Sequence, residues 1–524
     1  AQAAVDWCSA NRRELTLSGQ FYVAHVAGKN VTALIAPSYV DIVAENSGAF
    51  CMDFDPTEII GGNTYKGFSV FRSSDYLTAN ENTYISRELF RLRDVGFKGL
   101  WADHPRAKRQ ECAYLIGYDN VEMLNVNASD ISGGFARASY NGSWTTRGGR
   151  YERLSSGSIC RTRFTPNVYV DGCFVDGNSD DAFDCHATDN TPENPAFPVR
   201  SSIIITNVRL RNARFGAILG AVNITITNNI LERFYGGFGI VNNTGEGQGA
   251  NHSVTITGNH LLDPILRPDG TGIDDDNPSV PTSLDTGTNI AAITLGNAKP
   301  AGDGTVAAPW DWDATLTQFV EPYHAMSDTN AGPFWARDSI SSTSGTQTHF
   351  VKIYNNIIAR TLPTATNVSD WGYGSIFTSY GYMDPAATDD IFIDLGIDIY
   401  APIIALSIRG NTIFGMANPV SMNTAGIARA FLFSDITGND FIDFNVGIDG
   451  SWTGVSNSQG LGLSLLALKG ITLRNNTFAD MSRIGRVGTT DYATWNIQGN
   501  VALGQLASVA FSTSNLGVGS GLTG

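Results

Sequence analysis

The sequence predicts an all-β protein that folds as a right-handed parallel β-helix, a solenoid with long inserted loops. The first observation is a repeated pattern in which an apolar strand ends at Gly or Asn and a second apolar strand follows. It occurs eight times, as in ITITNNIL, LSIRGNTI and ITLRNNTF. Gly and Asn accept left-handed backbone angles at low cost, so each occurrence indicates a sharp bend. The bend residues are Asn207, Asn228, Gly258, Asn355, Gly410, Gly438, Asn475 and Gly499.

The second observation is the residue after each bend. It is asparagine at seven of the eight bends, and Val208 is the exception. Asparagines that recur at one structural position predict a stacked ladder, in which each amide bonds to the coils before and after it. The seven positions are Asn229, Asn259, Asn356, Asn411, Asn439, Asn476 and Asn500.

The third observation is the spacing. Starting from the earlier bend Asp171-Gly172, successive bends are 35, 21, 30, 97, 55, 28, 37 and 24 residues apart. The short intervals indicate a basal coil of 21–24 residues with three strands, and the long ones indicate inserted loops. The long amphipathic helices of an α/β protein are absent from the sequence pattern. The regular hairpin turns of a β-sandwich are absent too.

The domain organisation follows from this pattern. Residues 1–20 are expected to form a capping helix and the entry to the first strand, with Ala3, Ala4, Trp7 and Cys8 as the apolar helix face. Such a helix would cover strand edges that are otherwise exposed. Residues 21–112 are predicted to form an irregular β region. Residues 113–502 are predicted to form the β-helix with an insertion at 259–354, and 503–524 a tail or cap. We expect that the chain starts within a longer protein.

Composition excludes several classes of function. The formal charge of −16 argues against nucleic acid or an anionic membrane as a partner. No apolar run approaches the roughly 18 residues that a membrane-spanning helix needs. The six cysteines lack the C-x-x-C spacing of a zinc site, and Cys173 and Cys185 occupy apolar strand positions. We therefore expect buried free thiols, a protein made in a reducing compartment, no signal peptide and no metal site.

One stretch carries an unusual density of polar groups. In SDDAFDCHA, Phe183 and Cys185 alternate with Ala182, Asp184 and His186. Successive side chains of a strand point to opposite faces, so Phe183 and Cys185 should face the core. Asp184 and His186 should then face outward together, roughly 6.5–7 Å apart. That spacing suits a carboxylate and a partner that act on one bond.

Two segments resemble a known family. The opening LTLSGQFYV is similar to the first strand after the cap helix in pectate-lyase-like phage proteins, and SDDAFDCHA is similar to a stretch of the same group. With the Gly/Asn-Asn coils, the chain resembles bacteriophage tailspike depolymerases. The resemblance implies a homotrimer that binds and cuts bacterial surface polysaccharide. It also implies a protein of the virion tail that acts outside the bacterial cell and is made in the host cytoplasm. The N-terminal virion-binding domain expected of a tailspike is missing, and the C-terminal trimerisation domain is at most vestigial.

Cleavage of a glycosidic bond uses one carboxyl group as acid and another as base or nucleophile. Asp184, with Asp181 or Asp180, could supply the pair, and His186 could assist. Crowding of like charges would raise one carboxyl pKa, as an acid catalyst requires. Glu246, in a glycine-rich loop two coils further on, is a further candidate.

Other residues could bind the sugar. Arginines 147, 150, 153, 161 and 163 form a cluster that we expect to be a loop beside the acidic strand, able to bind acidic sugars. From this cluster we select Arg147, Arg150 and Arg163, and add Tyr235, Asn243, Trp310 and Trp312. No cofactor is expected to be required, although Asp274, Asp275 and Asp276 could hold Ca²⁺.

Three hypotheses for the function remain open. A hydrolase would use the paired carboxylates. A lyase or epimerase on uronic acids would use a base and a cation that neutralises the sugar carboxylate, for which His186 and the arginines are suited. A non-enzymatic adhesin would only bind. The density of aspartates on one strand favours catalysis over binding alone. Hydrolysis is the preferred interpretation, and the arginine cluster keeps a lyase open.

Overall fold

The computed structural model describes the strands, the bends and the N-terminal helix. The described residues are 1–23, 32–52, 68–75, 83–99, 110–131, 134–154, 159–177, 181–186, 190–191, 194–195, 201–219, 221, 223–234, 236–242, 252–263, 291–297, 348–359, 395–399, 403–414, 418–422, 431–432, 435–442, 461–465, 472–479, 483–487 and 496–503.

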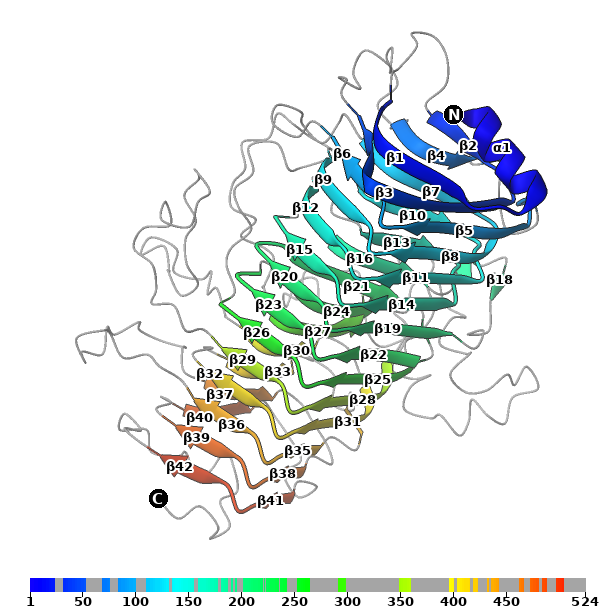
Figure 1. Cartoon of the computed structure of the whole chain (residues 1–524). Coiled ribbons are helices and arrows are strands. Elements are labelled where there is room, and N and C mark those ends of the chain that lie inside the picture. Colours follow the sequence, from blue (N-terminus) through cyan, green and yellow to red (C-terminus); the bar gives the residue numbers. More distant parts are fainter. Residues whose placement is uncertain are drawn as a thin grey trace, which may run out of the picture. The chain divides into compact units, whose positions relative to one another are not determined.

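The chain divides into two compact units. Unit 1 comprises residues 1–188, 200–218 and 269–283, and unit 2 comprises 189–199, 219–268 and 284–524. Both are built from the same coil (Figure 1). Two strands flank a bend and lie in one sheet, here called sheet 1, and a third strand lies in a second sheet, sheet 2.

Unit 1 begins with α1 (Gln2–Asn11) and β1 (Leu15–Tyr22). Its other sheet 1 strands are β3 (Tyr39–Cys51), β5 (Arg87–Arg93), β6 (Gly96–Lys98), β8 (Tyr118–Leu124), β9 (Asn127–Ile131), β11 (Ser143–Arg147), β12 (Arg150–Leu154), β14 (Asn167–Asp171), β15 (Phe174–Asp176), β19 (Ser202–Thr206) and β20 (Arg209–Arg211). Its sheet 2 strands are β2 (Thr32–Ala36), β4 (Phe68–Ser73), β7 (Gln110–Ile116), β10 (Ala136–Ser139), β13 (Cys160–Arg163), β16 (Asp181–His186) and β21 (Arg214–Leu219).

In unit 2, the sheet 1 strands are β22 (Asn223–Thr227), β23 (Ile230–Glu232), β25 (His252–Thr257), β26 (His260–Leu262), β28 (Thr348–Tyr354), β29 (Ile357–Ala359), β31 (Ile403–Arg409), β32 (Thr412–Phe414), β34 (Phe431–Leu432), β35 (Asp435–Thr437), β36 (Asp440–Ile442), β38 (Thr472–Arg474), β39 (Thr477–Ala479), β41 (Asn496–Gln498) and β42 (Val501–Leu503). The sheet 2 strands are β24 (Gly236–Asn242), β27 (Ala291–Asn297), β30 (Leu395–Ile399), β33 (Asn418–Met422), β37 (Leu461–Leu465) and β40 (Arg483–Val487). The short pair β17 (Asn190–Thr191) and β18 (Asn194–Pro195) is antiparallel.

The predicted parallel β-helix is confirmed. Strands of successive coils pair in parallel and in register, for example β5 with β8 in unit 1 and β28 with β31 in unit 2. All eight predicted bend residues have positive φ angles, between 51° and 67°. Parallel pairing also joins strands between residues 21 and 112, where we expected an irregular region. The interval 259–354, expected to be an insertion, contains β27, which pairs with β24 and β30.

The N-terminal helix forms where it was expected, but with a different buried face. Gln2 bonds through its amide to both the carbonyl and the N–H of Ile35 in β2, each at 2.9 Å, which fixes the helix on the first coil. Val5 and Cys8 are buried, whereas Trp7 is 60% exposed and Ala3 and Ala4 are exposed. The predicted apolar face was therefore wrong except for Cys8, because the helix docks on the coil along a different line.

The core of unit 1 is rich in aromatic rings. Phe50 lies 5.3 Å from Phe71 and 5.5 Å from Phe97, measured between ring centroids. Phe135 in turn lies 5.2 Å from Tyr151 of β12, edge to face. Such contacts between neighbouring coils stabilise the stack beyond the burial of their area.

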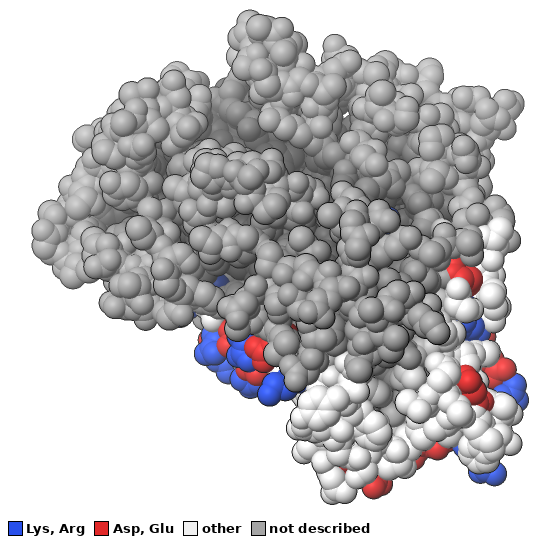
Figure 2. Space-filling view, turned by 90° about the horizontal axis from the view of Figure 1, so that it is seen from above, with Lys and Arg blue, Asp and Glu red and all other residues white. Residues whose placement is uncertain are grey.

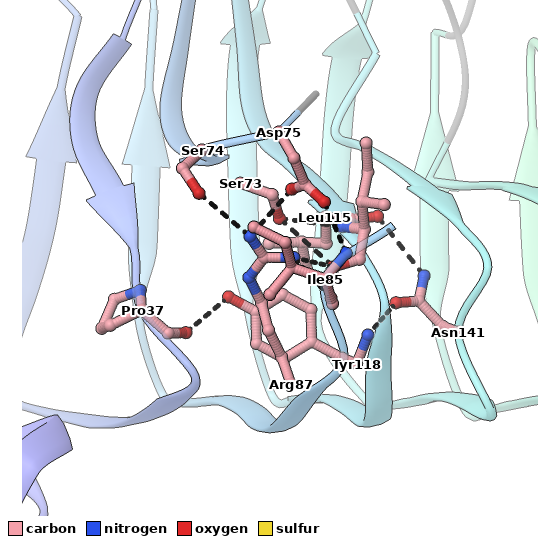
Figure 3. Close-up of polar contacts among 10 residues, drawn as sticks. Pro37, Ser73, Ser74, Asp75, Ile85, Arg87, Leu115, Tyr118 and Asn141 are labelled. Atoms are coloured by element: carbon pink, nitrogen blue, oxygen red, sulfur yellow. Dashed lines mark hydrogen bonds and ion pairs between the residues drawn. The ribbon is translucent and has the colours of Figure 1, made fainter. Parts of the chain in front are cut away.

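Unit 1 also buries an ion pair, shown in Figure 3. Arg87 donates from Nη2 to Asp75 at 2.8 Å and from Nη1 to the carbonyls of Ile85 and Ile116. Asp75 also accepts the N–H of Ile85 at 2.7 Å. Both charged side chains are less than a tenth exposed. The several hydrogen bonds offset the cost of removing these charges from water.

Unit 2 contains the predicted asparagine ladder. The Oδ1 atom of each asparagine after Asn229 accepts both the backbone N–H and the side-chain N–H of the asparagine one coil earlier, at 2.9–3.0 Å. From Asn259 onward, the side-chain amide also donates to a backbone carbonyl of the preceding coil. All seven side chains are buried. The ladder prediction is confirmed at every position.

All six cysteines are buried free thiols, as predicted. Burial raises the pKa of Cys112, Cys160 and Cys173 above the ordinary thiol value. Among the described residues, no helix is long and apolar enough to span a membrane.

Candidate functional site

The acidic strand β16 lies in sheet 2 of unit 1, beside β13, with Arg161 opposite Asp184 in the register. The alternation of inward and outward side chains in β16 is interrupted at the start of the strand. Ala182 and Phe183 are both fully buried, so the expectation that Ala182 faces outward was wrong. With two successive side chains turned inward, Asp181 and Asp184 both remain partly exposed, at 20% and 14%. The two predicted carboxylates therefore share the outer side of one strand.

The same step occurs in the preceding coils of sheet 2. Cys112 and Ala113 are both buried between Glu111 and Tyr114, and Phe135 and Ala136 are both buried before Arg137. The N–H groups of Cys112 and Ala113 both donate to the carbonyl of Phe135. Two residues opposite one acceptor mark a β-bulge. The bulge recurs from coil to coil, so it is a feature of the fold rather than a local irregularity of β16.

Each of the two carboxylates is held by an arginine from a neighbouring coil. Arg161 of β13 lies with Nε 3.0 Å from Asp184 Oδ2. Arg214 of β21 lies with Nε 2.7 Å from Asp181 Oδ1. The carboxylates are thus oriented from opposite sides, one by the coil before and one by the coil after. This fixes the position of the oxygens that acid or base chemistry would use.

Gly216 lets β21 approach this pair closely. A Cβ atom at this position would lie 2.2 Å from the carbonyl oxygen of Phe183 and 2.9 Å from Cβ of Asp181. Its φ of 116° also favours glycine. Any side chain at Gly216 would push β21, and with it Arg214, away from Asp181.

A column of large side chains crosses the outer side of sheet 2. The register places Arg72 opposite Tyr114, Tyr114 opposite Arg137, Arg137 opposite Arg161 and Arg161 opposite Asp184. The Arg72 guanidinium lies 5.9 Å from the centre of the Tyr114 ring. Glu111 and Arg137 form an ion pair, in which Oε1 of Glu111 lies 2.7 Å from Nε of Arg137. The column therefore presents one polar group per coil, about 4.8 Å apart.

Three stacked rings lie beside the ends of these strands. Tyr140 directly follows β10 and Phe164 directly follows β13, with ring centroids 4.5 Å apart and planes 13° apart. Tyr84 stacks on Tyr140 at 5.3 Å, above Gly117, where a Cβ would lie 2.9 Å from its ring. Tyr140 and Phe164 have φ values of 56° and 52°, which is uncommon for large side chains. The rings form an aromatic edge next to Arg163.

The arginine cluster is not the single loop that we expected. Arg147 in β11 and Arg150 in β12 belong to sheet 1, away from β16, whereas Arg161 and Arg163 belong to β13 in sheet 2. Arg147 lies over the ring of Tyr169, and Arg150 over that of Phe174, at 5.1 and 4.4 Å. The chain passes from one sheet to the other within the cluster, because one coil is only 21–24 residues long. Arg163 alone of the three selected arginines lies on the strand next to β16.

Several predicted residues lie outside the described part of the chain. His186 ends β16, but its side chain is not described. The remaining positions outside the description are Asp180, Tyr235, Asn243, Glu246, Asp274, Asp275, Asp276, Trp310 and Trp312. Within the described residues, no group of three or more His, Cys, Asp or Glu could hold a metal ion.

Sequence reasoning missed the arginines that orient the acidic strand. Arg137, Arg161 and Asp184 are 24 and 23 residues apart, which is the coil period already visible in the bends. Applying that period to charged residues would have placed Arg161 beside Asp184. In the view of Figure 2, acidic and basic side chains of the described residues lie next to one another, as such pairing requires.

Comparisons with known proteins gave one kind of match. No family model matches the sequence, and no curated protein matches it. The search of solved structures finds similarity to the tailspike protein of E. coli bacteriophage HK620. Two mutants of it in complex with pentasaccharide each match with a TM-score of 0.41 and 12% identity. Each match covers 97% of this chain and 63% of that chain, so this chain spans less than two thirds of the tailspike's length.

Proposed function

We propose that this protein binds and cleaves a bacterial surface polysaccharide, either lipopolysaccharide O-antigen or capsule, as a phage tailspike does. The site is the outer side of sheet 2 in unit 1, centred on β16. The observation that supports it best is that Asp181 and Asp184 share that side and are each oriented by an arginine. Two positioned carboxylates are what glycosidic hydrolysis requires.

In this proposal Asp184 is the central catalytic carboxylate. Asp181 is the partner nearest to it in the described chain, with Asp180 as the alternative, and His186 assists. The described pair of Asp181 and Asp184 is added to the pair of Asp184 and His186, which stays a prediction. Tyr140, Phe164 and Tyr84 provide an aromatic edge on which a sugar ring can stack.

A lyase is the second candidate, and the arginines favour it. Elimination from a uronic acid needs a cation near the sugar carboxylate. The exposed Arg163, two residues after Arg161 on the same strand, could supply it. An assay of the reaction products distinguishes the three hypotheses of hydrolase, lyase and adhesin. New reducing ends without ultraviolet absorbance indicate hydrolysis, ends with the absorbance of an unsaturated uronate indicate a lyase, and binding without products indicates an adhesin.

The test is Asp184→Asn, which keeps the side-chain shape and removes the charge. Turnover should fall by about 10²–10⁴-fold while polysaccharide binding is largely kept. Asp176→Asn is the matched control, because Asp176 is 17% exposed and pairs with Arg211, but lies in sheet 1. The control should cut at the normal rate.

If Asp184→Asn folds, binds and still cuts at a near-normal rate, Asp184 is a structural residue. Glu246 and the carboxylates at Asp274–Asp276 are then the next candidates. Loss of activity in both variants alike would point to a general requirement for arginine–aspartate pairs rather than to a site at β16.

We further propose that the protein is a homotrimer that belongs to the phage tail and acts at the outside of the bacterial cell. All six cysteines are buried thiols that form no disulfide, which is consistent with synthesis in the host cytoplasm. Light scattering at micromolar concentration should give the trimer mass. A monomer mass contradicts the proposal for this chain.

A further inference from the structure

The three stacked rings beside the ends of the sheet 2 strands in unit 1 repeat with the coils. Tyr140 follows β10 and Phe164 follows β13, and their ring centroids lie 4.5 Å apart. Tyr84 lies 5.3 Å from Tyr140 on the other side. Both distances are close to the spacing of about 4.8 Å between neighbouring strands. A further ring in this series would therefore lie at the level of the next coil, which is that of β16.

The stack is closed at one end and stops at the other. The equivalent position after β7 is Gly117, where a Cβ would lie 2.9 Å from the Tyr84 ring, so Tyr84 takes the place of a side chain there. In the sequence, the residue after β16 is Ala187, which has no ring to continue the series. Among the described residues, Tyr140 is the only aromatic residue that stacks on Phe164. The other face of the Phe164 ring is turned toward the coil of β16.

The backbone at Tyr140 and Phe164 has a conformation that large side chains rarely adopt, with φ values of 56° and 52°. At all eight predicted bends of sheet 1, this left-handed conformation is taken by Asn or Gly, which accept it at low cost. A strained backbone of this kind is found where function requires a particular side chain. The ring of Phe164 therefore has a role that the turn alone does not require.

We propose that one sugar ring of the polysaccharide stacks on this face of Phe164 and continues the aromatic series at the level of β16. This inference rests on the proposed function, and it names the class of sugar at a subsite next to the catalytic pair. A pyranose whose hydroxyl groups are mostly equatorial presents a face of C–H groups, which packs flat on an aromatic ring through dispersion and apolar burial. A ring with axial hydroxyl groups on both faces fits the site less well.

The subsite lies beside the bond to be cleaved rather than at it. Phe164 is three residues after Arg161, which lies opposite Asp184 in the register. Three residues of a strand span roughly 10 Å, so the stacked sugar is a neighbour of the ring on which Asp184 acts. An interaction made equally with the bound substrate and the transition state lowers KM and leaves kcat unchanged. Phe164 should therefore govern affinity and the choice of polymer, and Asp184 the rate of cleavage.

The first experiment uses the full chain with Asp184→Asn, which should bind the polymer without consuming it. A panel of purified O-antigens and capsular polysaccharides identifies the polymer that binds. Adding Phe164→Leu, which keeps an apolar side chain but removes the ring, should weaken that binding by about tenfold, whereas Phe164→Tyr should keep it. Phe174→Leu is the matched control and should bind as its parent does. Phe174 is also half-buried and is covered by the Arg150 guanidinium, but lies in sheet 1.

The second experiment distinguishes a sugar subsite from a packing role. In the protein with Asp184 intact, Phe164→Leu should raise KM for the same polymer by about tenfold and leave kcat unchanged. Phe164→Asn places at this position a residue that accepts a φ of 52°. Its melting temperature should therefore stay close to that of the unsubstituted protein, while its affinity for the polymer falls as in Phe164→Leu.

Unchanged affinity of Phe164→Leu overturns this inference, and cleavage of the polymer by the unsubstituted protein then leaves the proposed function standing. Equal losses in Phe164→Leu and Phe164→Tyr also overturn it, because tyrosine keeps the ring. A large fall in the melting temperature of Phe164→Asn together with unchanged affinity would show that the ring only packs against Tyr140. Binding to no polysaccharide of the panel overturns the proposed function and this inference together.

Discussion

The two units make the same bend with different residues after it. In unit 1 the residue that follows each bend is Val95, Val126, Gly149, Cys173 or Val208. In unit 2 it is always asparagine. The backbone bonding is the same in both: the bend N–H donates to the next coil, as from Asn125 to Arg147 and from Asn355 to Arg409. The bend therefore does not require asparagine.

The two units differ in how the interior beside the bend is filled. Unit 1 uses apolar and aromatic side chains, and one of its buried polar networks surrounds Arg87. Unit 2 runs a neutral amide ladder along the whole stack. The charged pair of Arg87 and Asp75 and the asparagine ladder both give their buried polar groups hydrogen-bond partners, which is the condition that stability imposes. Substitution of one residue should therefore change the stability of the two units by different amounts.

The bend residues of unit 2 are also coupled from coil to coil. Where asparagine occupies a bend, the next bend is glycine, and a Cβ there would meet the asparagine Oδ1 at 2.3–2.9 Å. This holds for Gly258 after Asn228, Gly410 after Asn355 and Gly499 after Asn475. Gly438, which follows Gly410, has nothing within 4 Å. At these three bends of unit 2, glycine avoids a clash with the asparagine side chain of the preceding coil.

The largest effect is expected from Asp75→Ala in unit 1. It leaves the Arg87 guanidinium buried without its charge partner and the Ile85 N–H without its acceptor. The free energy of unfolding should fall by about 3–5 kcal/mol. Asp176→Ala in the same unit removes a partly exposed pair and should cost less than about 1 kcal/mol. Urea unfolding of both variants tests this, and equal costs would contradict it.

Alkaline pH should destabilise unit 1 more than unit 2. All six cysteines lie in unit 1, and burial raises the pKa of Cys112, Cys160 and Cys173. Above about pH 9 these thiols ionise in the unfolded chain but stay protonated in the native state, so unfolding releases protons. Their stabilising contribution is complete below that pH and falls as pH rises, by up to about 1.4 kcal/mol per pH unit for each thiol.

Pulse proteolysis in urea at a series of pH values measures this difference, with fragments assigned to each unit by mass spectrometry. The urea midpoint of unit 1 should fall more steeply above about pH 9. Parallel loss in both units would show that the thiols are not the cause.

Exchanging the two kinds of interior residue tests the comparison directly. Asn439→Leu leaves the backbone and side-chain N–H groups of Asn411 without their acceptor, and should cost about 1–3 kcal/mol. Val126→Asn places an amide between the apolar Val95 and Gly149 coils, where no ladder exists, and should cost a similar amount. A melting temperature unchanged by either substitution would refute the corresponding half of the comparison.

The smallest effect concerns the bends. Gly438→Asn should be nearly neutral, because asparagine accepts a φ of 66° and the space is open. Gly410→Asn meets the Asn355 side chain at 2.6 Å and should cost about 1 kcal/mol more. Thermal unfolding of the pair gives the difference, and the opposite order would show that neighbouring bends are not coupled.

The sequence by itself determined the parallel β-helix, the eight bends and the complete ladder from Asn229 to Asn500. These features are periodic, and the repeats share a residue that accepts a left-handed conformation, which in unit 2 is followed by a buried asparagine. It also determined that Phe183 and Cys185 point inward and that the thiols are buried. Such positions can be predicted from the sequence because the same pattern recurs in several coils, so a coil with an ambiguous pattern can be assigned from the others.

Only the tertiary structure decided which charged residues meet. Strict alternation put Ala182 outside, but Ala182 and Phe183 are both buried, as are Cys112 and Ala113 in the strand β7 of the same sheet, and Asp181 and Asp184 lie on the same side. Proximity in sequence grouped Arg147 and Arg150 with Arg161, but a coil of this length crosses from one sheet to the other between them. The pairs of Arg161 with Asp184 and of Arg214 with Asp181 form between coils, where contact depends on the register of stacking rather than on neighbours along the chain.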